Sequence, residues 1–244
     1  MDADRPLVPL PLAGVTVVVA RPIDQAAAMV ALLEARGATA VVVPLVEIVD
    51  AADPAALDAA LAEVDTFDWV VVTSPNAAIR VARAIAAAPS VRVGAIGRAT
   101  AELLPRVDLV PEAQSADGFV DAFATGSGRV LVLQATAGAP TLVAGLSAKG
   151  WDVQRVHTHD TRAVRPSARQ QLAILRADVV LLTSGSQARA WVEAFGDAAP
   201  PIVGAIGPQT ARDAGSAGLK VSFVAADHSL VGLVDALQDF WAQQ

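Results

Sequence analysis

Residues 68–101 read DWVVVTSPNAAIRVARAIAAAPSVRVGAIGRATA, and residues 178–211 read DVVLLTSGSQARAWVEAFGDAAPPIVGAIGPQTA. The two stretches align without a gap. They share Thr-Ser at 73–74 and 183–184, Gly-Ala-Ile-Gly at 94–97 and 204–207, and Thr-Ala at 100–101 and 210–211. Each predicts a short apolar strand, an Ala-rich helix, a second strand and a further helix. Such alternation is typical of parallel sheets covered by helices on both faces, an α/β architecture.

The repeat extends beyond these stretches. Residues 118–122 resemble 232–236, and residues 14–37 resemble 128–150. In this alignment Ala135 is the counterpart of Arg21, so the charge of Arg21 is not duplicated. We interpret the chain as two copies of one α/β unit.

The remaining sequence continues the same alternation. We expect strands at 15–20, 38–43, 69–73, 91–96, 108–110, 129–133, 152–156, 179–183, 202–206 and 220–223. We expect helices at 24–36, 54–64, 76–87, 99–104, 116–124, 140–149, 168–176, 187–195, 209–214 and 230–241.

Composition narrows the functional classes. The chain has 244 residues, of which 54% are hydrophobic and 18% charged, so it can bury a substantial core. It contains no cysteine, which excludes disulfides, thiolate metal sites and a cysteine nucleophile. A net charge of −7 with no Lys/Arg run argues against nucleic acid as a partner. The acidic start at residues 1–5 and the short apolar runs predict no signal peptide and no membrane span, hence a cytoplasmic protein.

Hydroxyl and amide side chains recur where strands end and helices begin. The two sets are Thr73, Ser74 and Asn76, and Thr183, Ser184 and Ser186. In a parallel sheet this is the carboxyl edge, where ligands bind. These side chains can cap helices, and the free N–H groups of a first helical turn attract anions. Both interpretations, cap and ligand contact, stay open for each residue.

A second repeated pattern places a glycine after a strand and a threonine in the next helix. Its members are Gly97, Arg98 and Thr100 in one copy, and Gly207, Gln209 and Thr210 in the other. Neither the dinucleotide-binding fingerprint nor the P-loop is present. Arg21 follows the first strand and is expected to point from the carboxyl edge toward a bound anion, or to form a surface ion pair.

The histidines suggest no metal site. His157 and His159 are two residues apart on an expected strand and would share one face, but no third ligand is positioned by the sequence. We therefore predict no metal and no cofactor. From the residues alone, the chain is a two-lobed α/β protein that binds an anionic small molecule.

Taken in order, the motifs resemble the uroporphyrinogen-III synthase family. The resemblance covers residues 14–240. It rests on VVARP at 18–22, VVVPLVEI at 41–48, DWVVVTSPNA at 68–77, AIGRATA at 95–101, SADG at 115–118, LTS at 182–184 and AIGPQT at 205–210. The family implies two flavodoxin-like parallel-sheet lobes joined by a two-stranded linker. One lobe would contain residues 1–44 and 161–244, the other 48–156, with linker strands at 44–48 and 156–161.

The resemblance also implies an activity. Members dehydrate and cyclise linear hydroxymethylbilane to uroporphyrinogen III with inversion of the last pyrrole ring, without a cofactor. The substrate is a polycarboxylate tetrapyrrole, and Arg21, Arg98 and the helix starts at the two repeated motifs would bind it. The family suggests a monomer, with transient contact to the preceding enzyme of the pathway.

Two positions depart from the family pattern. His159 stands where members commonly carry a tyrosine and would be the general acid for the departing hydroxyl. Gln134-Ala135 stands where Arg-Gly is usual. The alternatives are therefore a catalytically inactive, synthase-like protein that binds tetrapyrroles or regulates a partner, and a generic two-lobed solute-binding protein.

Overall fold

The computed structural model describes residues 10–244. Residues 1–9, which include the acidic start, lie outside the described part. The chain divides into two compact units. Unit 1 contains the described residues up to Glu47 together with Arg162–Gln244, and unit 2 contains Ile48–Thr161. The chain thus leaves unit 1 once and returns to it once.

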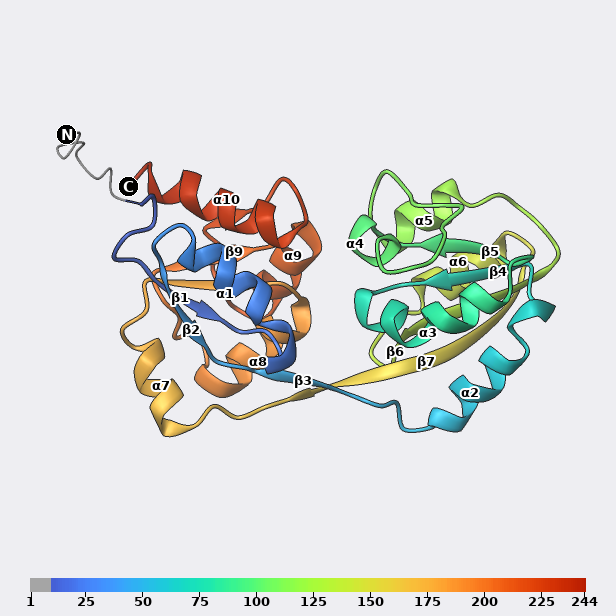
Figure 1. Cartoon of the computed structure of the whole chain (residues 1–244), viewed down its shortest axis with the longest axis horizontal. Coiled ribbons are helices and arrows are strands. Elements are labelled where there is room, and N and C mark those ends of the chain that lie inside the picture. Colours follow the sequence, from blue (N-terminus) through green and yellow to red (C-terminus); the bar gives the residue numbers. More distant parts are fainter. Residues whose placement is uncertain (1–9) are drawn as a thin grey trace, which may run out of the picture. The chain divides into compact units, whose positions relative to one another are not determined.

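Unit 1 is built on a five-stranded sheet with the order β10-β9-β8-β1-β2. Figure 1 labels β1, β2 and β9 of this sheet. Every strand pair in this sheet is parallel. The strands are β1 (Thr16–Val19), β2 (Thr39–Val42), β8 (Val179–Leu182), β9 (Ile202–Ala205) and β10 (Phe223–Val224). Numbered along the chain within the unit, the order is 2-1-3-4-5, which is that of the flavodoxin-like folds.

Helices cover both faces of the unit 1 sheet because its strands are apolar on both sides. Val17 and Val19 pack against α1 and α10, whereas Val18 faces the opposite layer with α8 and α9. The helical elements are η1 (Ile23–Gln25), α1 (Ala27–Glu34), α7 (Ala168–Ile174), α8 (Gly185–Phe195), α9 (Pro208–Ser216) and α10 (Leu230–Trp241).

Unit 2 contains the second sheet, with the order β3-β7-β6-β4-β5. The β4–β5, β4–β6 and β6–β7 pairs are parallel. The strands are β3 (Val46–Val49), β4 (Trp69–Val72), β5 (Arg92–Ala95), β6 (Arg129–Ala135) and β7 (Asp152–Ala163). β3 and β7 each cross the boundary between the two units, so the sheet carries both connecting segments at one edge.

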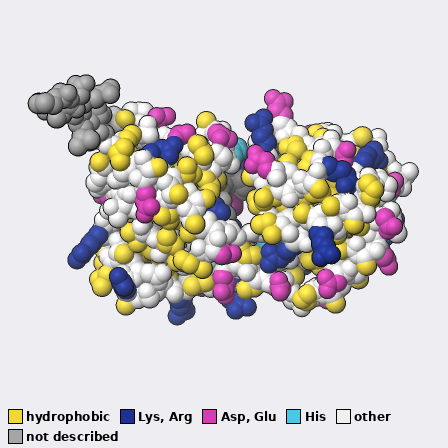
Figure 2. Space-filling model, viewed as in Figure 1, with side chains coloured by type: hydrophobic (Ala, Val, Ile, Leu, Met, Phe, Trp, Pro, Cys, Tyr) yellow, Lys and Arg dark blue, Asp and Glu magenta, His cyan; other side chains and the backbone are white. Residues whose placement is uncertain are grey.

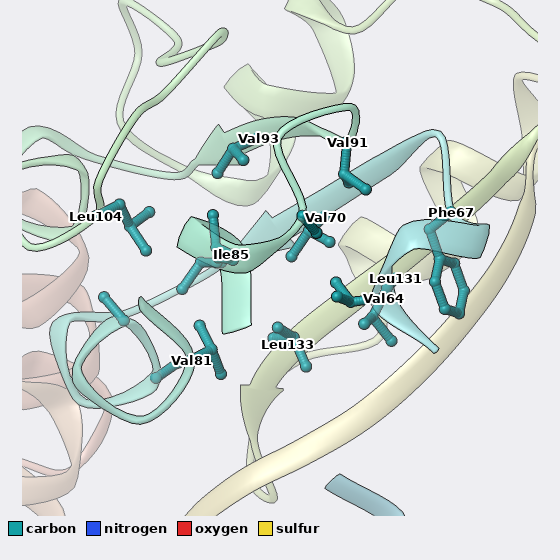
Figure 3. Packing of buried hydrophobic residues seen from close by; sticks show 14 of the residues in the cluster. Val64, Phe67, Val70, Val81, Ile85, Val91, Val93, Leu104, Leu131 and Leu133 are labelled. Atoms are coloured by element: carbon teal, nitrogen blue, oxygen red, sulfur yellow. The ribbon is translucent and has the colours of Figure 1, made fainter. Parts of the chain in front are cut away.

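The unit 2 sheet is also covered on both faces. Figure 3 shows one of its two cores, in which side chains of β4, β5 and β6 pack against α3 and the segment around Val64 and Phe67. α5 and α6 cover the other face. The helical elements are α2 (Pro54–Ala62), η2 (Val64–Thr66), α3 (Pro75–Ala87), α4 (Arg98–Ala101), α5 (Ala116–Ala122) and α6 (Thr141–Ala148). The predicted α/β class is confirmed, with two mostly parallel sheets.

Some expected elements differ in extent. The helix expected at 24–36 is divided into η1 and α1, where the Gln25 carbonyl accepts a hydrogen bond from Arg21 Nε at 3.0 Å. The strand expected at 108–110 is a single bridge between Gly94 and Leu109. The strand expected at 152–156 continues to Ala163, because its second half pairs with the end of β6 and neighbours β3.

The strand register corrects one part of the repeat alignment. Val19 pairs with Leu181 in unit 1, and Val132 pairs with Val71, the counterpart of Leu181, in unit 2. Val19 therefore corresponds to Val132. Two residues further along, the counterpart of Arg21 is Gln134 rather than Ala135. Gln134 is uncharged, so the charge of Arg21 still has no counterpart in unit 2.

Among residues 10–244, no helix is long and apolar enough to cross a membrane. On the face drawn in Figure 2, Lys and Arg side chains are scattered among acidic ones and form no continuous basic surface.

Candidate functional site

Arg21 lies at the carboxyl edge of the unit 1 sheet, just after β1. Its Nε donates to the Gln25 carbonyl at 3.0 Å, its Nη2 to the Gln25 side chain at 3.3 Å, and its Nη1 to Thr183 Oγ1 at 3.2 Å. Burial lowers the pKa of Arg21, and the nearby Asp24 carboxylate partly opposes this. A guanidinium stays charged in proteins, so a fixed and partly desolvated cation stands at this edge.

Thr183 and Ser184 follow β8, the strand that neighbours β1. Ser184 is the N-cap of α8: its Oγ accepts from Gln187 N at 3.3 Å and lies 2.9 Å from Ser186 Oγ. Thr183 Oγ1 lies between Arg21 and the side chain of Gln187. The structure thus brings the predicted residues Arg21, Thr183, Ser184 and Ser186 together, because β1 and β8 are adjacent.

The next strand, β9, ends at the second motif of unit 1. Gly207 is the N-cap residue of α9 and has no side-chain cap, while the His228 ring lies about 3.2 Å from where a Cβ would stand. Thr210 is buried, at 7% exposure. Gln209 instead bonds along its own helix, to Asp213 at 2.8 Å and from Arg212 at 2.8 Å.

In unit 2, the matching hydroxyl motif follows β4. Thr73 Oγ1 donates to the Leu133 carbonyl at 3.3 Å, and Ser74 caps α3 by accepting from Ala77 N at 3.2 Å. The Asn76 carbonyl accepts from Arg80 Nη1 at 3.3 Å. The hydroxyls of Ser74 and Ser184 are therefore both helix caps.

The glycine motif of unit 2 is closed by a side chain that sequence reasoning did not single out. Gln114 Oε1 accepts from Arg98 N at 2.9 Å and would lie 2.8 Å from a Cβ on Gly97. The Arg98 side chain is exposed, and Thr100 is 3% exposed. Since Gln114 takes up the first N–H of α4, the start of this helix is less open to an anion than that of α9.

The histidine pair does not share a face, contrary to the prediction. Gln134 pairs with His157, but the next residue of β6, Ala135, pairs with His159, so Thr158 is an extra residue in β7. Paired residues share a face and successive residues of β6 alternate, so the two histidines point to opposite faces. Within residues 10–244, no group of three or more His, Cys, Asp or Glu residues could hold a metal ion.

His159 is nearly completely buried, at 3% exposure. Its Nδ1 lies 2.8 Å from Thr158 Oγ1, and its carbonyl accepts from Thr136 N at 2.9 Å. Burial lowers the pKa of His159, the charge of Arg80 lowers it further and Asp160 partly compensates, so that the pKa is about 4. The imidazole is therefore neutral at pH 7, with about one molecule in a thousand carrying the extra proton.

Comparison with known proteins decides the family. The family model described as "Uroporphyrinogen-III synthase HemD" matches residues 27–235. The chain belongs to this family. The resemblance seen in the sequence motifs is confirmed, and the two-unit α/β fold is the one that the family implies.

Named relatives agree with this assignment, and solved structures share the fold. The chain is 28% identical to the chloroplastic uroporphyrinogen-III synthase of Oryza sativa, over 91% of this chain and 79% of the relative. It is 26% identical to the uroporphyrinogen-III synthase of Synechococcus elongatus, over 96% and 98%. A mutant uroporphyrinogen III synthase from Thermus thermophilus has the same fold, with a TM-score of 0.68 and 17% identity over 94% and 100%. The uroporphyrinogen-III synthetase from Helicobacter pylori matches with a TM-score of 0.57 and 17% identity, over 92% of this chain and 98% of the other.

Four residues near the predicted site were missed by sequence reasoning, namely Gln25, Arg80, Gln114 and Gln187. The repeat held a signal for two of them. Gln114 occupies the position of His228 at the same offset that relates residues 118–122 to 232–236, and Gln187 aligns with Ala77. Positions at which the two copies of the repeat differ can therefore also indicate polar side chains at the sheet edges, as identical positions do.

Proposed function

We propose that this chain is a uroporphyrinogen-III synthase, which dehydrates and cyclises hydroxymethylbilane to uroporphyrinogen III with inversion of the last pyrrole ring. The family match across residues 27–235 is the observation that carries the proposal. The polar carboxyl edges of the two sheets support it, because they bring anion-binding groups to the positions that the family motifs occupy.

The chemistry of this substrate explains why the chain needs no conventional catalytic motif. The hydroxyl of hydroxymethylbilane leaves as water, with a proton gained and with electrons pushed from a pyrrole nitrogen, and a cationic azafulvene remains. The terminal pyrrole then attacks through its substituted carbon, and the spiro intermediate fragments and recloses. Loss of a proton after the final closure restores the aromatic pyrrole and balances the proton gained. Without the enzyme, the same substrate closes to the uninverted isomer. The protein therefore acts mainly by holding one geometry.

The eight carboxylates of the substrate require local positive potential on a chain of net charge −7. Arg21, held among Gln25 and Thr183, supplies a preorganised cation, and Arg98 supplies an exposed one. The α9 start at Gly207 supplies N–H groups without a side-chain cap. Further residues are proposed to bind the substrate. In unit 1 they are Thr183, Ser184, Ser186 and Thr210, with Gly207 at the turn and Gln209 on the α9 surface. In unit 2 they are Thr73, Ser74, Asn76 and Thr100, with Gly97 at the turn.

His159 is proposed to take part as a neutral hydrogen-bonding group. A pKa of about 4 leaves little imidazolium at pH 7, so a donated proton would have to come from the weakly acidic neutral ring or through a bound water. His159 is therefore a poor general acid at pH 7, and the proton that the departing water gains comes mainly from another source.

The proposed activity also suggests where the protein works and which enzyme it contacts. The linear substrate closes spontaneously, so rapid transfer from the enzyme that makes it favours the correct isomer. We propose a cytoplasmic monomer that contacts this preceding enzyme transiently.

The test is to incubate the purified chain with freshly prepared hydroxymethylbilane and to resolve the product isomers after oxidation. We expect isomer III, while a protein-free sample gives isomer I. If the chain yields only isomer I yet binds uroporphyrin III, the inactive tetrapyrrole-binding alternative replaces the proposal.

A further inference from the structure

Gln187 is a buried amide at the carboxyl edge of the unit 1 sheet. It is the third residue of α8 and is 3% exposed. Its side chain turns back toward the end of β8. Oε1 accepts from Thr183 N at 2.8 Å, and Nε2 lies 3.0 Å from Thr183 Oγ1. A buried amide in a helix is costly unless both its ends are paired, and here one residue, Thr183, pairs with both.

The orientation of this amide is determined by its neighbour. A backbone N–H can only donate, so the Thr183 N–H requires the oxygen end of Gln187. The Thr183 hydroxyl accepts from Nε2 at 3.0 Å and can donate its own proton to Oε1 at 3.2 Å. The Arg21 guanidinium can also only donate, and its Nη1 reaches the same hydroxyl at 3.2 Å. Thr183 Oγ1 is thus the common acceptor of Gln187 and Arg21, and the three side chains form one connected chain of hydrogen bonds.

Unit 2 shows what the same edge looks like without this amide. Gln187 corresponds to Ala77 and Arg21 to Gln134. There the Thr73 N–H and hydroxyl both donate to the Leu133 carbonyl of the neighbouring strand, at 3.2 and 3.3 Å. The threonine hydroxyl therefore turns to the sheet in unit 2 and to an arginine in unit 1. This difference in the threonine hydroxyl goes together with the presence of Gln187 in unit 1 and of Ala77 at the same position in unit 2.

We propose that Gln187 is a positioning residue for carboxylate binding: it holds Thr183 so that Arg21 is fixed with its remaining donors toward a substrate carboxylate. This inference rests on the proposed function. Of the five N–H groups of Arg21, three are directed to Gln25 and Thr183, and two have no partner within residues 10–244. A guanidinium fixed before binding loses less side-chain freedom when it pairs with a carboxylate. Unit 1 therefore supplies the anchored carboxylate contact, and unit 2 lacks its counterpart.

A double-mutant cycle between Gln187→Ala and Arg21→Ala tests this coupling. The measured quantities are KM and kcat with hydroxymethylbilane, and the Kd for uroporphyrin III, the stable oxidised product. We expect Gln187→Ala to raise KM and Kd about tenfold, with kcat changed less than twofold. In the Arg21→Ala background, the same substitution should add less than twofold, because Gln187 acts through the missing guanidinium.

Two further variants separate positioning from packing. Gln187→Met keeps the side-chain volume without the amide and should weaken binding as Gln187→Ala does. Gln170→Ala removes another glutamine that bonds the backbone, in the capping box of α7, and should leave KM unchanged. Because Ala77 occupies the same position in the folded unit 2, Gln187→Ala should fold, and its thermal midpoint confirms this for the assay samples.

The inference is overturned if Gln187→Met binds like the unmodified chain, or if the Gln187 and Arg21 effects are additive. If the unmodified chain forms no isomer III, the proposed function fails, but the cycle measured on the Kd for uroporphyrin III still decides the role of Gln187. If the unmodified chain does not bind uroporphyrin III either, both proposals fall.

Discussion

His159 is held neutral by its surroundings, and this has a consequence for stability. The pKa is lowered from 6.5 to about 4, first by burial and then by Arg80. The unfolded chain therefore binds a proton at higher pH than the folded chain does. Stability from this residue is complete above about pH 6.5 and is lost as the pH falls toward 4.

A His159→Gln variant, neutral at every pH, tests this residue. We expect the unmodified chain to lose about 2 to 3 kcal/mol of unfolding free energy relative to the variant between pH 7 and pH 4.5. Urea unfolding at the two pH values measures the difference. His228→Gln, at an exposed position, serves as the control and should follow the unmodified chain. Parallel pH curves for all three proteins would contradict the assigned pKa.

The N-terminal ends of helices line the carboxyl edges of the two sheets. Five serines cap helices by accepting from an N–H in the first turn, namely Ser74, Ser115, Ser167, Ser184 and Ser229. A cap residue and a ligand contact make the same demand, a small polar side chain at the start of a helix, so sequence alone could not separate them. The structure assigns the cap role, and the ligand role stays a prediction.

Ser184→Asp separates the two roles at α8. Aspartate caps a helix as well as serine and suits its positive end, so the thermal midpoint should hold or rise slightly. The added charge should repel a substrate carboxylate and raise the Kd for uroporphyrin III about fivefold to tenfold. Ser167→Asp, at the start of α7, is the matched control and should leave the Kd unchanged. An unaltered Kd for Ser184→Asp would show that no carboxylate binds near this cap.

The elements also mark where sequence reasoning stops. The apolar strands and the repeated motifs predict the two parallel sheets and place Arg21 and Thr183 each at the carboxyl end of a strand, because hydrophobic periodicity reports which side chains are buried. That the two residues belong to one lobe is implied only by the family resemblance. The bulge at Thr158 could not be predicted in this way. One extra residue in a ladder leaves the local composition unchanged, yet it turns His157 and His159 to opposite faces. Gln187 was missed although its partner Thr183 lies only four residues away, because the sequence does not show that the amide turns back to the end of β8 instead of to solvent.

At the scale of the whole molecule, an acidic chain is proposed to bind a polyanion. The net charge of −7 acts at long range and is screened by salt, whereas Arg21 acts at short range within a partly buried edge. Because salt screens the long-range repulsion between the acidic chain and the polyanion more than the short-range Arg21 contact, we expect the Kd for uroporphyrin III to fall or stay level between 50 and 500 mM NaCl. Arg21→Ala should raise the Kd at both salt concentrations. A Kd for Arg21→Ala that equals that of the unmodified chain at both salt concentrations, measured by fluorescence titration, would place the main anion contact elsewhere.

The isomer composition formed by the unmodified chain, held in molar excess over hydroxymethylbilane, tests the central claim most directly. Under this condition, binding outpaces spontaneous closure, so the account predicts that nearly all the product is uroporphyrinogen III. A product that is isomer I, as in protein-free buffer, would contradict it.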